Sequence, residues 1–410
     1  MTSFGIAQGS GQGSGQGSGQ GSGQGSGQGS GQGGELSHAG GPANTLLNFA
    51  LAMTHDGVMG QWRGLQERTP SAMGTDEAGD LDYLAGPSRA RVMDAELASL
   101  FTVTPLEDGT GATLRFHARP LIALTRPSPE VFRQQLSYLR DYTDLRADRI
   151  AEIQLQTSDL LSFFGAVGFL NTSRRRRTLE LLGLILGQVV RVEALMKHYC
   201  RAPRPIDYSN LVHPIIQTPD HSTFPSGHAT EAFAVATVLD ALMGDGVNDR
   251  SGKLNFADPP TIAESTSEIA DGPGYAMPYR VAARIAINRT VAGVHFPIDT
   301  MAGALMGYIV GQTFVALAKG EAPTLEPFEG ELLGAREDFS LKLLADKLEA
   351  LTQAASSKDA KSDEGNGDKV SGENKGKDAA QPLAPAFQRL WGKAQAEWEA
   401  DLTYAPADAQ

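Results

Sequence analysis

Apolar residues recur at three- and four-residue spacing along most of the chain between residues 43 and 354. This spacing gathers them on one side of an α-helix, so the pattern predicts a protein built from amphipathic and buried helices. The segments with this pattern are 43–54, 91–101, 129–142, 145–168, 173–199, 229–244, 278–291, 297–319 and 336–354. We therefore expect an all-α fold with a helical-bundle core.

Local signals indicate where two of these helices start and which segment is not helical. Ser128 followed by Pro129 is typical of a cap and the first helical residue, which fits a start of the helix 129–142. Asn171-Thr172-Ser173 offers an N-cap to the helix 173–199. Only the segment 112–124 alternates in the manner of a strand, and it is too little to build a sheet.

Polar, low-complexity stretches divide the chain. A Gly-Gln-Gly-Ser repeat and a Lys/Asp/Glu/Gly/Ser-rich stretch contain too few apolar residues to offset the entropy of ordering, so both are expected to be disordered. The expected regions are a disordered repeat at 1–34, a helical domain at 35–354, a charged linker at 355–382 and a short amphipathic segment at 383–410. The last segment is expected to dock on the domain or on a second subunit. Residues 244–277, rich in Gly, Asp, Ser and Pro, are expected to form a long loop excursion between core helices.

The window 300–318 is uncharged and nearly long enough to cross a bilayer. Gly303, Gly307 and Gly311 recur in it at four-residue spacing, which permits close approach of a neighbouring helix. This favours a buried helix of the bundle, and because no second comparable window exists we expect no integral membrane span. The N-terminus lacks a basic region followed by an apolar run, so no signal peptide is expected. The cytoplasm is then the default location, with non-classical export as the alternative.

The overall charge limits the classes of partner. A formal net charge of -13 argues against a broad surface for nucleic acid or anionic lipid. Any anion site must then be a local pocket of positive charge. The single cysteine, Cys200, excludes an intramolecular disulfide and gives no zinc motif.

Three basic residues are candidates for such a pocket. Lys197 lies near the end of the helix 173–199, and Arg204 follows between two prolines that end the helix, so Arg204 can fold back toward Lys197. Arg289 lies near the end of the helix 278–291. Lysine supplies a point charge and arginine a fork that matches two oxygens. Each residue alone is typical of a solvated surface; the combination with the next two segments predicts an oxyanion site.

Those two segments each place histidine at the start of a helix. Ser226, Gly227 and His228 directly precede an apolar helix, whose first N–H groups and dipole favour an anion. His295 stands two residues before Pro297, which suits a first helical turn. Asp299 follows four residues after His295, close enough to hold one of its ring N–H groups and so fix which nitrogen faces the anion.

Together the segments resemble the signature of the vanadium-dependent haloperoxidase and type 2 phosphatidic acid phosphatase superfamily. That pattern is Lys-x6-Arg-Pro, then Pro-Ser-Gly-His, then Ser-Arg-x5-His-x3-Asp. Here it is Lys197…Arg204-Pro205, Pro225-Ser226-Gly227-His228 and Arg289…His295…Asp299. The order and spacings match over roughly residues 190 to 305. One departure is Asn288, which stands where the pattern has serine and weakens any hydroxyl contact with the anion there.

The resemblance implies a role for each residue. The groups that hold the anion oxygens are Lys197, Arg204, Arg289, Ser226 and the N–H of Gly227. His295 bonds the central atom, which makes it the expected metal ligand for vanadium, and His228 is the general acid/base on the opposite side. Vanadate is the implied cofactor and phosphate its competitor, both in the domain 35–354.

The residues around this signature bear on the reaction. The run from His221 to Thr230 resembles the algal bromoperoxidase branch. We expect a second histidine on the peroxide side to relay protons or to tune the oxidation. We therefore expect a haloperoxidase that uses hydrogen peroxide to oxidise bromide or iodide, with chloride as a third candidate, and that halogenates a small organic acceptor. Two alternatives stand beside it: a soluble acid phosphatase acting through a phosphohistidine at His295, and a catalytically silent anion-binding relative. His221 as an ordinary polar loop residue is the corresponding alternative for that position, and a homo-oligomer is compatible with each interpretation.

Overall fold

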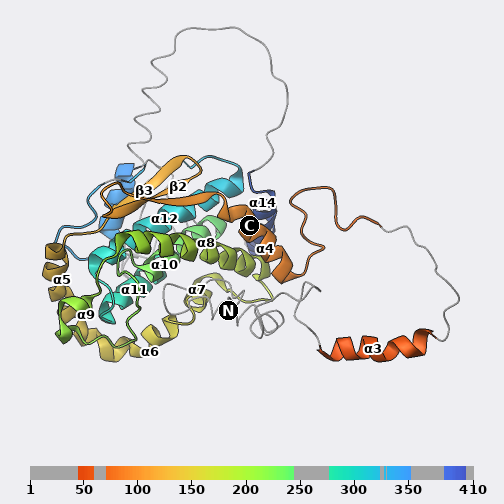
Figure 1. Ribbon diagram of the computed structural model, residues 1–410, viewed down its shortest axis with the longest axis horizontal. Helices are drawn as coiled ribbons and strands as arrows, with labels where there is room; N and C mark the ends of the chain where they lie inside the picture. The colour runs from red at the N-terminus through yellow and green to blue at the C-terminus, as the bar shows by residue number, and fades with distance from the viewer. Residues whose placement is uncertain are drawn as a thin grey trace, which may run out of the picture.

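The computed structural model describes residues 45–59, 71–243, 277–323, 327–328, 330–351 and 383–402. Helices dominate these residues, so the all-α class is confirmed (Figure 1). The expected disordered segments 1–34 and 355–382 lie outside the described residues. So does the expected loop excursion, apart from Met277.

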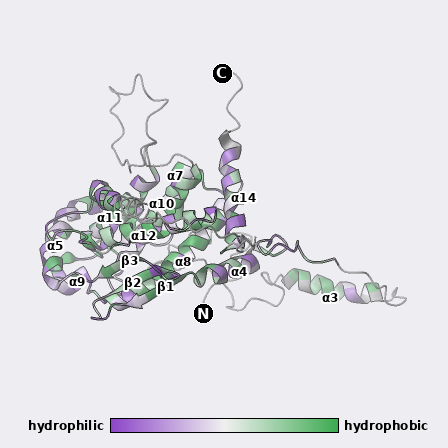
Figure 2. Ribbon diagram, turned by 90° about the horizontal axis from the view of Figure 1, so that it is seen from above, coloured by the Kyte–Doolittle hydropathy of each residue, from purple (hydrophilic) through white to green (hydrophobic). Residues whose placement is uncertain are grey.

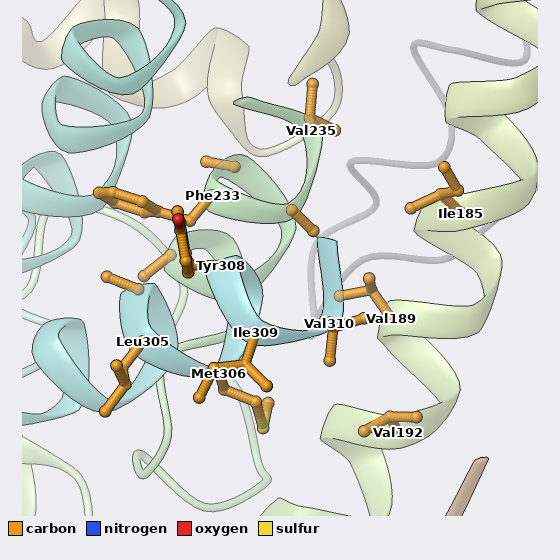
Figure 3. Packing of buried hydrophobic residues seen from close by; sticks show 14 of the residues in the cluster. Ile185, Val189, Val192, Phe233, Val235, Leu305, Met306, Tyr308, Ile309 and Val310 are labelled. Carbon is orange, nitrogen blue, oxygen red and sulfur yellow. The ribbon is translucent and has the colours of Figure 1, made fainter. Parts of the chain in front are cut away.

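Four helices form the centre of the bundle: α8 (Arg176–Cys200), α10 (Gly227–Met243), α11 (Met277–Val291) and α12 (Pro297–Lys319). Their apolar side chains belong to one buried cluster, which Figure 3 shows in part with Ile185 of α8, Phe233 of α10 and Ile309 of α12. α12 is long and apolar enough to cross a membrane, but 89% of its apolar window is buried within the protein. That burial agrees with the expected core helix.

The glycines of α12 bring it unusually close to α10. A Cβ atom on Gly303 would lie 2.3 Å from the carbonyl oxygen of Ser226, and one on Gly307 would lie 2.3 Å from that of Thr230. Both approaches are possible only without a side chain. The predicted close approach is therefore confirmed, and it places the start of α10 directly on α12.

A small antiparallel sheet lies beside the helices, in the order β1 (Phe101–Pro105), β2 (Gly111–Phe116) and β3 (Arg119–Thr125). The expectation that 112–124 could not build a sheet is wrong. The preceding residues 101–105 supply a third strand, in which Val103 pairs with Leu114. The connection between β2 and β3 turns at His117, which adopts a positive φ of 51°.

The segment predicted as one helix over 145–168 forms two, α6 (Arg146–Gln156) and α7 (Leu161–Gly168). Polar side chains at the break bond to nearby backbone and compete with the helix. Thr157 Oγ1 donates to the Gln154 carbonyl (2.7 Å), and Asp159 Oδ1 accepts from the Ser162 N–H (3.0 Å). α6 thus ends at Gln156.

The remaining described helices are α3 (Thr45–Met59), α4 (Gly86–Ala98), α5 (Pro129–Asp141), α9 (Pro205–Tyr208) and α14 (Pro385–Leu402), together with two 3-10 turns (Tyr142–Leu145 and Asn210–Val212) and a helical stretch at 341–351. The predicted Ser128 cap of α5 is confirmed. α5 and α9 lie at one end of the bundle, and α4 and α14 lie at the other (Figures 1 and 2).

The C-terminal helix α14 packs against α8 and α4. Its Glu397 carboxylate accepts bonds from the N–H groups of Arg177 (2.7 Å) and Thr178 (2.9 Å) at the start of α8. The expected N-cap at Asn171-Thr172-Ser173 is wrong, because Asn171 Oδ1 accepts from the Ser173 hydroxyl and from the N–H groups of Ser173 and Arg174, all of which precede the start of α8 at Arg176. The cap of α8 therefore comes from a residue more than two hundred positions later.

Candidate functional site

The predicted site residues lie at or beside the end of α8, the start of α10, the end of α11 and the start of α12. Buried residues among them are Lys197, Arg204, Ser226, Gly227, His228, Arg289, His295 and Asp299. His221 is half-buried. The chain thus gathers in one place residues that its sequence spreads over about a hundred positions.

Arg204 links both histidine-bearing segments to the end of α8. Its Nη1 donates to the Val294 carbonyl oxygen (2.9 Å) and lies 3.2 Å from His295 Nε2. Its Nη2 lies 3.1 Å from His221 Nδ1, and its Nε donates to the His221 carbonyl oxygen (2.9 Å). The backbone N–H of Arg204 donates to Asp207 Oδ2 (2.8 Å), which fixes the turn into α9. The arginine fork is therefore held rigidly between the two histidines.

Lys197 reaches the loop that leads into α10. Its Nζ donates to the carbonyl oxygens of Ser222 (3.1 Å) and Pro225 (2.6 Å). Burial, and then the positive charge of Arg204, lowers the pKa of Lys197 to about 8. The ammonium group is thus fixed just before Ser226, in an environment that favours an additional negative charge.

Three buried donor atoms at this junction have no hydrogen-bond partner within the described residues: Arg289 Nε, Arg289 Nη1 and Ser226 Oγ. Buried polar atoms in proteins are normally paired, so unpaired donors in one place indicate a ligand. Burial lowers the pKa of Arg289 to about 10 and that of Arg204 to about 10, which leaves both guanidinium groups charged at neutral pH. The chemistry of these donors fits an oxyanion.

The hydrogen bonds of His295 define its tautomer. Its Nδ1 lies 3.2 Å from Asp299 Oδ2, which also accepts from Thr223 Oγ1 (2.5 Å) and from the Phe296 N–H (2.8 Å). Arginine can only donate, so the contact from Arg204 requires a lone pair on His295 Nε2. The proton then lies on Nδ1, facing Asp299. His295 consequently presents an unprotonated Nε2 to the cation cluster.

Both central histidines are neutral near neutral pH. Burial lowers the pKa of His228 well below its usual range, assisted by the charge of Arg289. Burial does the same to the pKa of His295, assisted by Arg204 and Lys197. Burial also raises the pKa of Asp299 to about 6, so this carboxyl is still mostly ionised at pH 7. A neutral imidazole at His228 is able to accept a proton.

Residues outside the motifs complete the site. Gln156 Oε1 accepts from Arg289 Nη2 (2.6 Å), and the Gln156 carbonyl oxygen lies 3.1 Å from His228 Nε2. Sequence reasoning missed Gln156, because nothing local connects it to residues more than seventy positions away. It also missed Thr223, whose only sequence signal is its place in the same run as Ser226.

Asn288, the departure from the pattern, is bonded to α6. Its Nδ2 donates to Glu152 Oε1 (2.8 Å) and Gln156 Oε1 (3.1 Å), and its Oδ1 accepts from Arg149 Nη1 (3.1 Å). The amide replaces a possible anion contact with three bonds to a neighbouring helix. The Asn288 side chain therefore connects α11 to α6, where a serine hydroxyl would have been available to the anion.

Residues 178–321 match the family model of the PAP2 superfamily. A vanadium-dependent bromoperoxidase from Ascophyllum nodosum is 29% identical over 131 residues, which are 30% of this chain and 23% of that protein. The chain thus spans less than a quarter of the length of this relative. The crystal structure of a transmembrane PAP2-type phosphatidylglycerolphosphate phosphatase from Bacillus subtilis aligns with 45% of this chain and 75% of that chain, at 19% identity and a TM-score of 0.25.

The segment that matches the superfamily contains α10, α11, α12 and nearly all of α8. All nine site residues predicted from the sequence also lie inside it. The PAP2 superfamily includes both vanadium haloperoxidases and phosphatases. Residues 178–321 of this chain therefore match a PAP2 superfamily domain, and the cation and histidine cluster lies within that segment.

Proposed function

We propose that the protein is a vanadium-dependent haloperoxidase, which uses hydrogen peroxide to oxidise bromide or iodide and halogenates an organic acceptor. The observation that carries the proposal is the contact of His221 Nδ1 with Arg204 Nη2 at 3.1 Å. It makes the second histidine part of the anion cluster and not of a remote loop. The similarity to a bromoperoxidase supports the same class.

Vanadate fits the residues present. The unpaired Arg289 Nε, Arg289 Nη1 and Ser226 Oγ, with Lys197 and Arg204, would hold its oxygens. The unprotonated Nε2 of His295 would be its protein ligand, with Asp299 fixing the ring through Nδ1. When bound, vanadate supplies a centre that activates hydrogen peroxide toward halide.

The protein's own groups orient the reactants and move protons. His228 donates from Nε2 to the Gln156 carbonyl oxygen, which fixes the ring, and its neutral imidazole would act as the base that takes a proton from hydrogen peroxide. Arg204 fixes the positions of His221 and His295 relative to one another. The fixed positive charges of the site stabilise negative charge without reorganisation during the reaction.

A phosphomonoesterase is the second candidate, favoured by the same unprotonated Nε2 of His295. That nitrogen is a suitable nucleophile toward a phosphate ester, and the three cations would hold the phosphoryl oxygens equally well. The two candidates differ in what they require of His221, whose Nδ1 lies against Arg204 Nη2.

The deciding experiment compares both activities in one preparation. Purified full-length protein with vanadate, hydrogen peroxide and bromide is expected to brominate a phenolic acceptor, and turnover of an aryl phosphate without vanadate is expected to be slow. His221→Ala should change the pH profile and the halide preference while vanadate affinity changes little. Rapid aryl phosphate hydrolysis, with no bromination and a silent His221→Ala variant, would establish the phosphatase instead.

A further inference from the structure

The C-terminal turn of α6 contacts residues of the oxyanion site, although α6 lies outside the segment that matches the superfamily. The last carbonyl groups of a helix have no partner within the helix and need one elsewhere. Here the Ile153 carbonyl oxygen accepts from Arg289 Nη2 (3.4 Å), and the Gln156 carbonyl oxygen lies 3.1 Å from His228 Nε2. Two site residues thus dock on the end of one helix, whose dipole favours positive charge at that end.

The side chain of Gln156 makes the shortest of these contacts. It is fully buried, and its Oε1 accepts from Arg289 Nη2 at 2.6 Å and from Asn288 Nδ2 at 3.1 Å. Its Nε2 donates to Glu152 Oε1 at 3.1 Å. Every polar atom of this amide therefore has a partner, and the amide has one orientation that satisfies all of them.

The neutrality of Gln156 matters for the charge of Arg289. The Arg289 guanidinium donates to two uncharged groups, the Gln156 amide oxygen and the Ile153 carbonyl oxygen. The nearby carboxylate of Glu152 is instead paired with Arg284, with 2.9 Å between Oε2 and Nη2. Arg289 is therefore held in place by uncharged hydrogen-bond partners, although the charges of Glu152 and Glu231 act on it through space, and its Nε and Nη1 remain unpaired within the described residues.

We propose that Gln156 is a positioning residue of the oxyanion site: it aims the Arg289 guanidinium at the anion and, being uncharged, adds no negative charge that would compete with the anion for it. The proposal rests on the oxyanion site described above and extends that site to α6. A carboxylate at this position would also hold Arg289 but would compete with the anion for its charge.

The test measures binding of inorganic phosphate to full-length, vanadate-free protein by titration calorimetry. Gln156→Glu keeps the size and the bond to Arg289 but adds a charge, and should weaken phosphate binding about tenfold or more at pH 8. The loss should shrink as the pH falls, because a protonated carboxyl can donate to Glu152 as the amide does. Gln156→Met should also weaken binding, since it releases Arg289.

Gln188→Met is the matched control. Gln188 is a buried glutamine of α8 that donates to Asp94 Oδ1 (2.6 Å), about 14 Å along the helix from Lys197. The Gln188→Met variant should be less stable than the parental protein but should keep its phosphate affinity. A double-mutant cycle with Arg289→Gln adds a readout that loss of folding alone does not produce: in that background Gln156→Met should cause no further loss of affinity.

The outcomes distinguish a wrong oxyanion site from a wrong role for Gln156. If the parental protein binds no phosphate, the oxyanion site itself is wrong. If the parental protein binds phosphate and Gln156→Glu binds it as tightly at every pH, the proposal that the neutrality of Gln156 favours anion binding is overturned. Additive losses in the cycle would likewise overturn it, because Gln156 would then act independently of Arg289.

Discussion

At the scale of single residues, the site is a set of buried positive charges that repel one another. Burial and mutual repulsion lower the pKa of Lys197 to about 8 and keep His228 and His295 neutral. A bound oxyanion would reverse both effects, because it supplies the missing negative charge. The excess of buried positive charge therefore favours binding of an anion at this site.

The lowered pKa of Lys197 predicts how anion binding depends on pH. Lys197 is protonated below about pH 8 and loses its charge as the pH rises through that value. Phosphate affinity of the vanadate-free protein should therefore fall above about pH 8. Calorimetric titrations between pH 7 and pH 9, below the range in which Arg204 and Arg289 lose their charge, test this, with Lys197→Met as the comparison. That variant should bind weakly throughout and lack the decline; an identical decline in it would assign the effect to another group.

His228 is expected to act on protons and not on anion retention. His228→Ala should reduce bromination turnover by roughly a hundred- to ten-thousand-fold, the range for a lost general acid/base, while vanadate affinity stays within a few-fold. Steady-state assays together with vanadate titration measure both. His198→Ala, at an exposed position of α8, is the control and should behave like the parent. Near-parental turnover in His228→Ala would remove this residue from the mechanism.

The spacing of the sequence motifs predicted which residues meet in the site, but not which hydrogen-bond partners hold them in place. The lysine, arginine and histidine positions followed from the motifs. Gln156 and Thr223 did not, because their contacts depend on how α6 and the loop before α10 pack. The Asn288 departure likewise acquires a meaning only through its bonds to Glu152 and Gln156.

At the scale of elements, the contact between α10 and α12 sets the position of the anion-binding turn. Ser226 N–H donates to the Asp299 carbonyl oxygen (2.9 Å), so the start of α10 is bonded to the first turn of α12. The glycines of α12 let the two backbones meet one turn further on. Any change in this spacing moves Ser226 and Gly227 relative to His295.

Gly303→Ala is expected to disturb both stability and the site. The added Cβ would lie 2.3 Å from the Ser226 carbonyl oxygen, a backbone atom that can move only with α10. The free energy of unfolding should fall by about 1–3 kcal/mol, as for other overpacked cores, and phosphate affinity should fall with it. Urea denaturation and calorimetry measure the two effects. In contrast, Gly187→Ala on α8 meets nothing within 4 Å and should be neutral or stabilising; equal behaviour of the two variants would contradict the close packing.

Periodicity identified the long helices well and the short elements poorly. The predicted 297–319 coincides with α12, because its apolar pattern and Pro297 agree. The break after Gln156 was missed, since it depends on local bonds of Thr157 and Asp159 that compete with the helix. The small sheet was missed because each of its strands is short, and sheet pairing is not visible in one strand's alternation.

At the scale of the whole molecule, the C-terminal helix α14 joins the end of the chain to the start of α8. Besides Glu397, Trp398 Nε1 donates to Thr178 Oγ1 (3.1 Å), and the Arg175 guanidinium stacks on the Trp398 ring at 3.9 Å. α8 carries Lys197 at its opposite end. The C-terminal segment therefore supports the helix that presents one of the three cations.

Glu397→Ala is expected to destabilise the protein without altering the chemistry. It removes the acceptor of two backbone N–H groups at the start of α8, which should lower the free energy of unfolding by about 1–3 kcal/mol. Phosphate affinity at a temperature where the variant stays folded should be parental. Glu399→Ala, at an exposed position on the same helix, should change neither quantity. A Glu397→Ala variant as stable as the parent would show that the cap is dispensable.

The most direct test of the central claim is the stoichiometry of vanadate retained by the purified protein. Equilibrium dialysis of vanadate-free protein should give one vanadium per chain, displaced by excess phosphate, because both anions would use the same donors. His295→Ala should abolish this retention, since its Nε2 is the proposed ligand. Retention unchanged in His295→Ala, or vanadate that phosphate never displaces, would contradict a single oxyanion site at the junction of these helices.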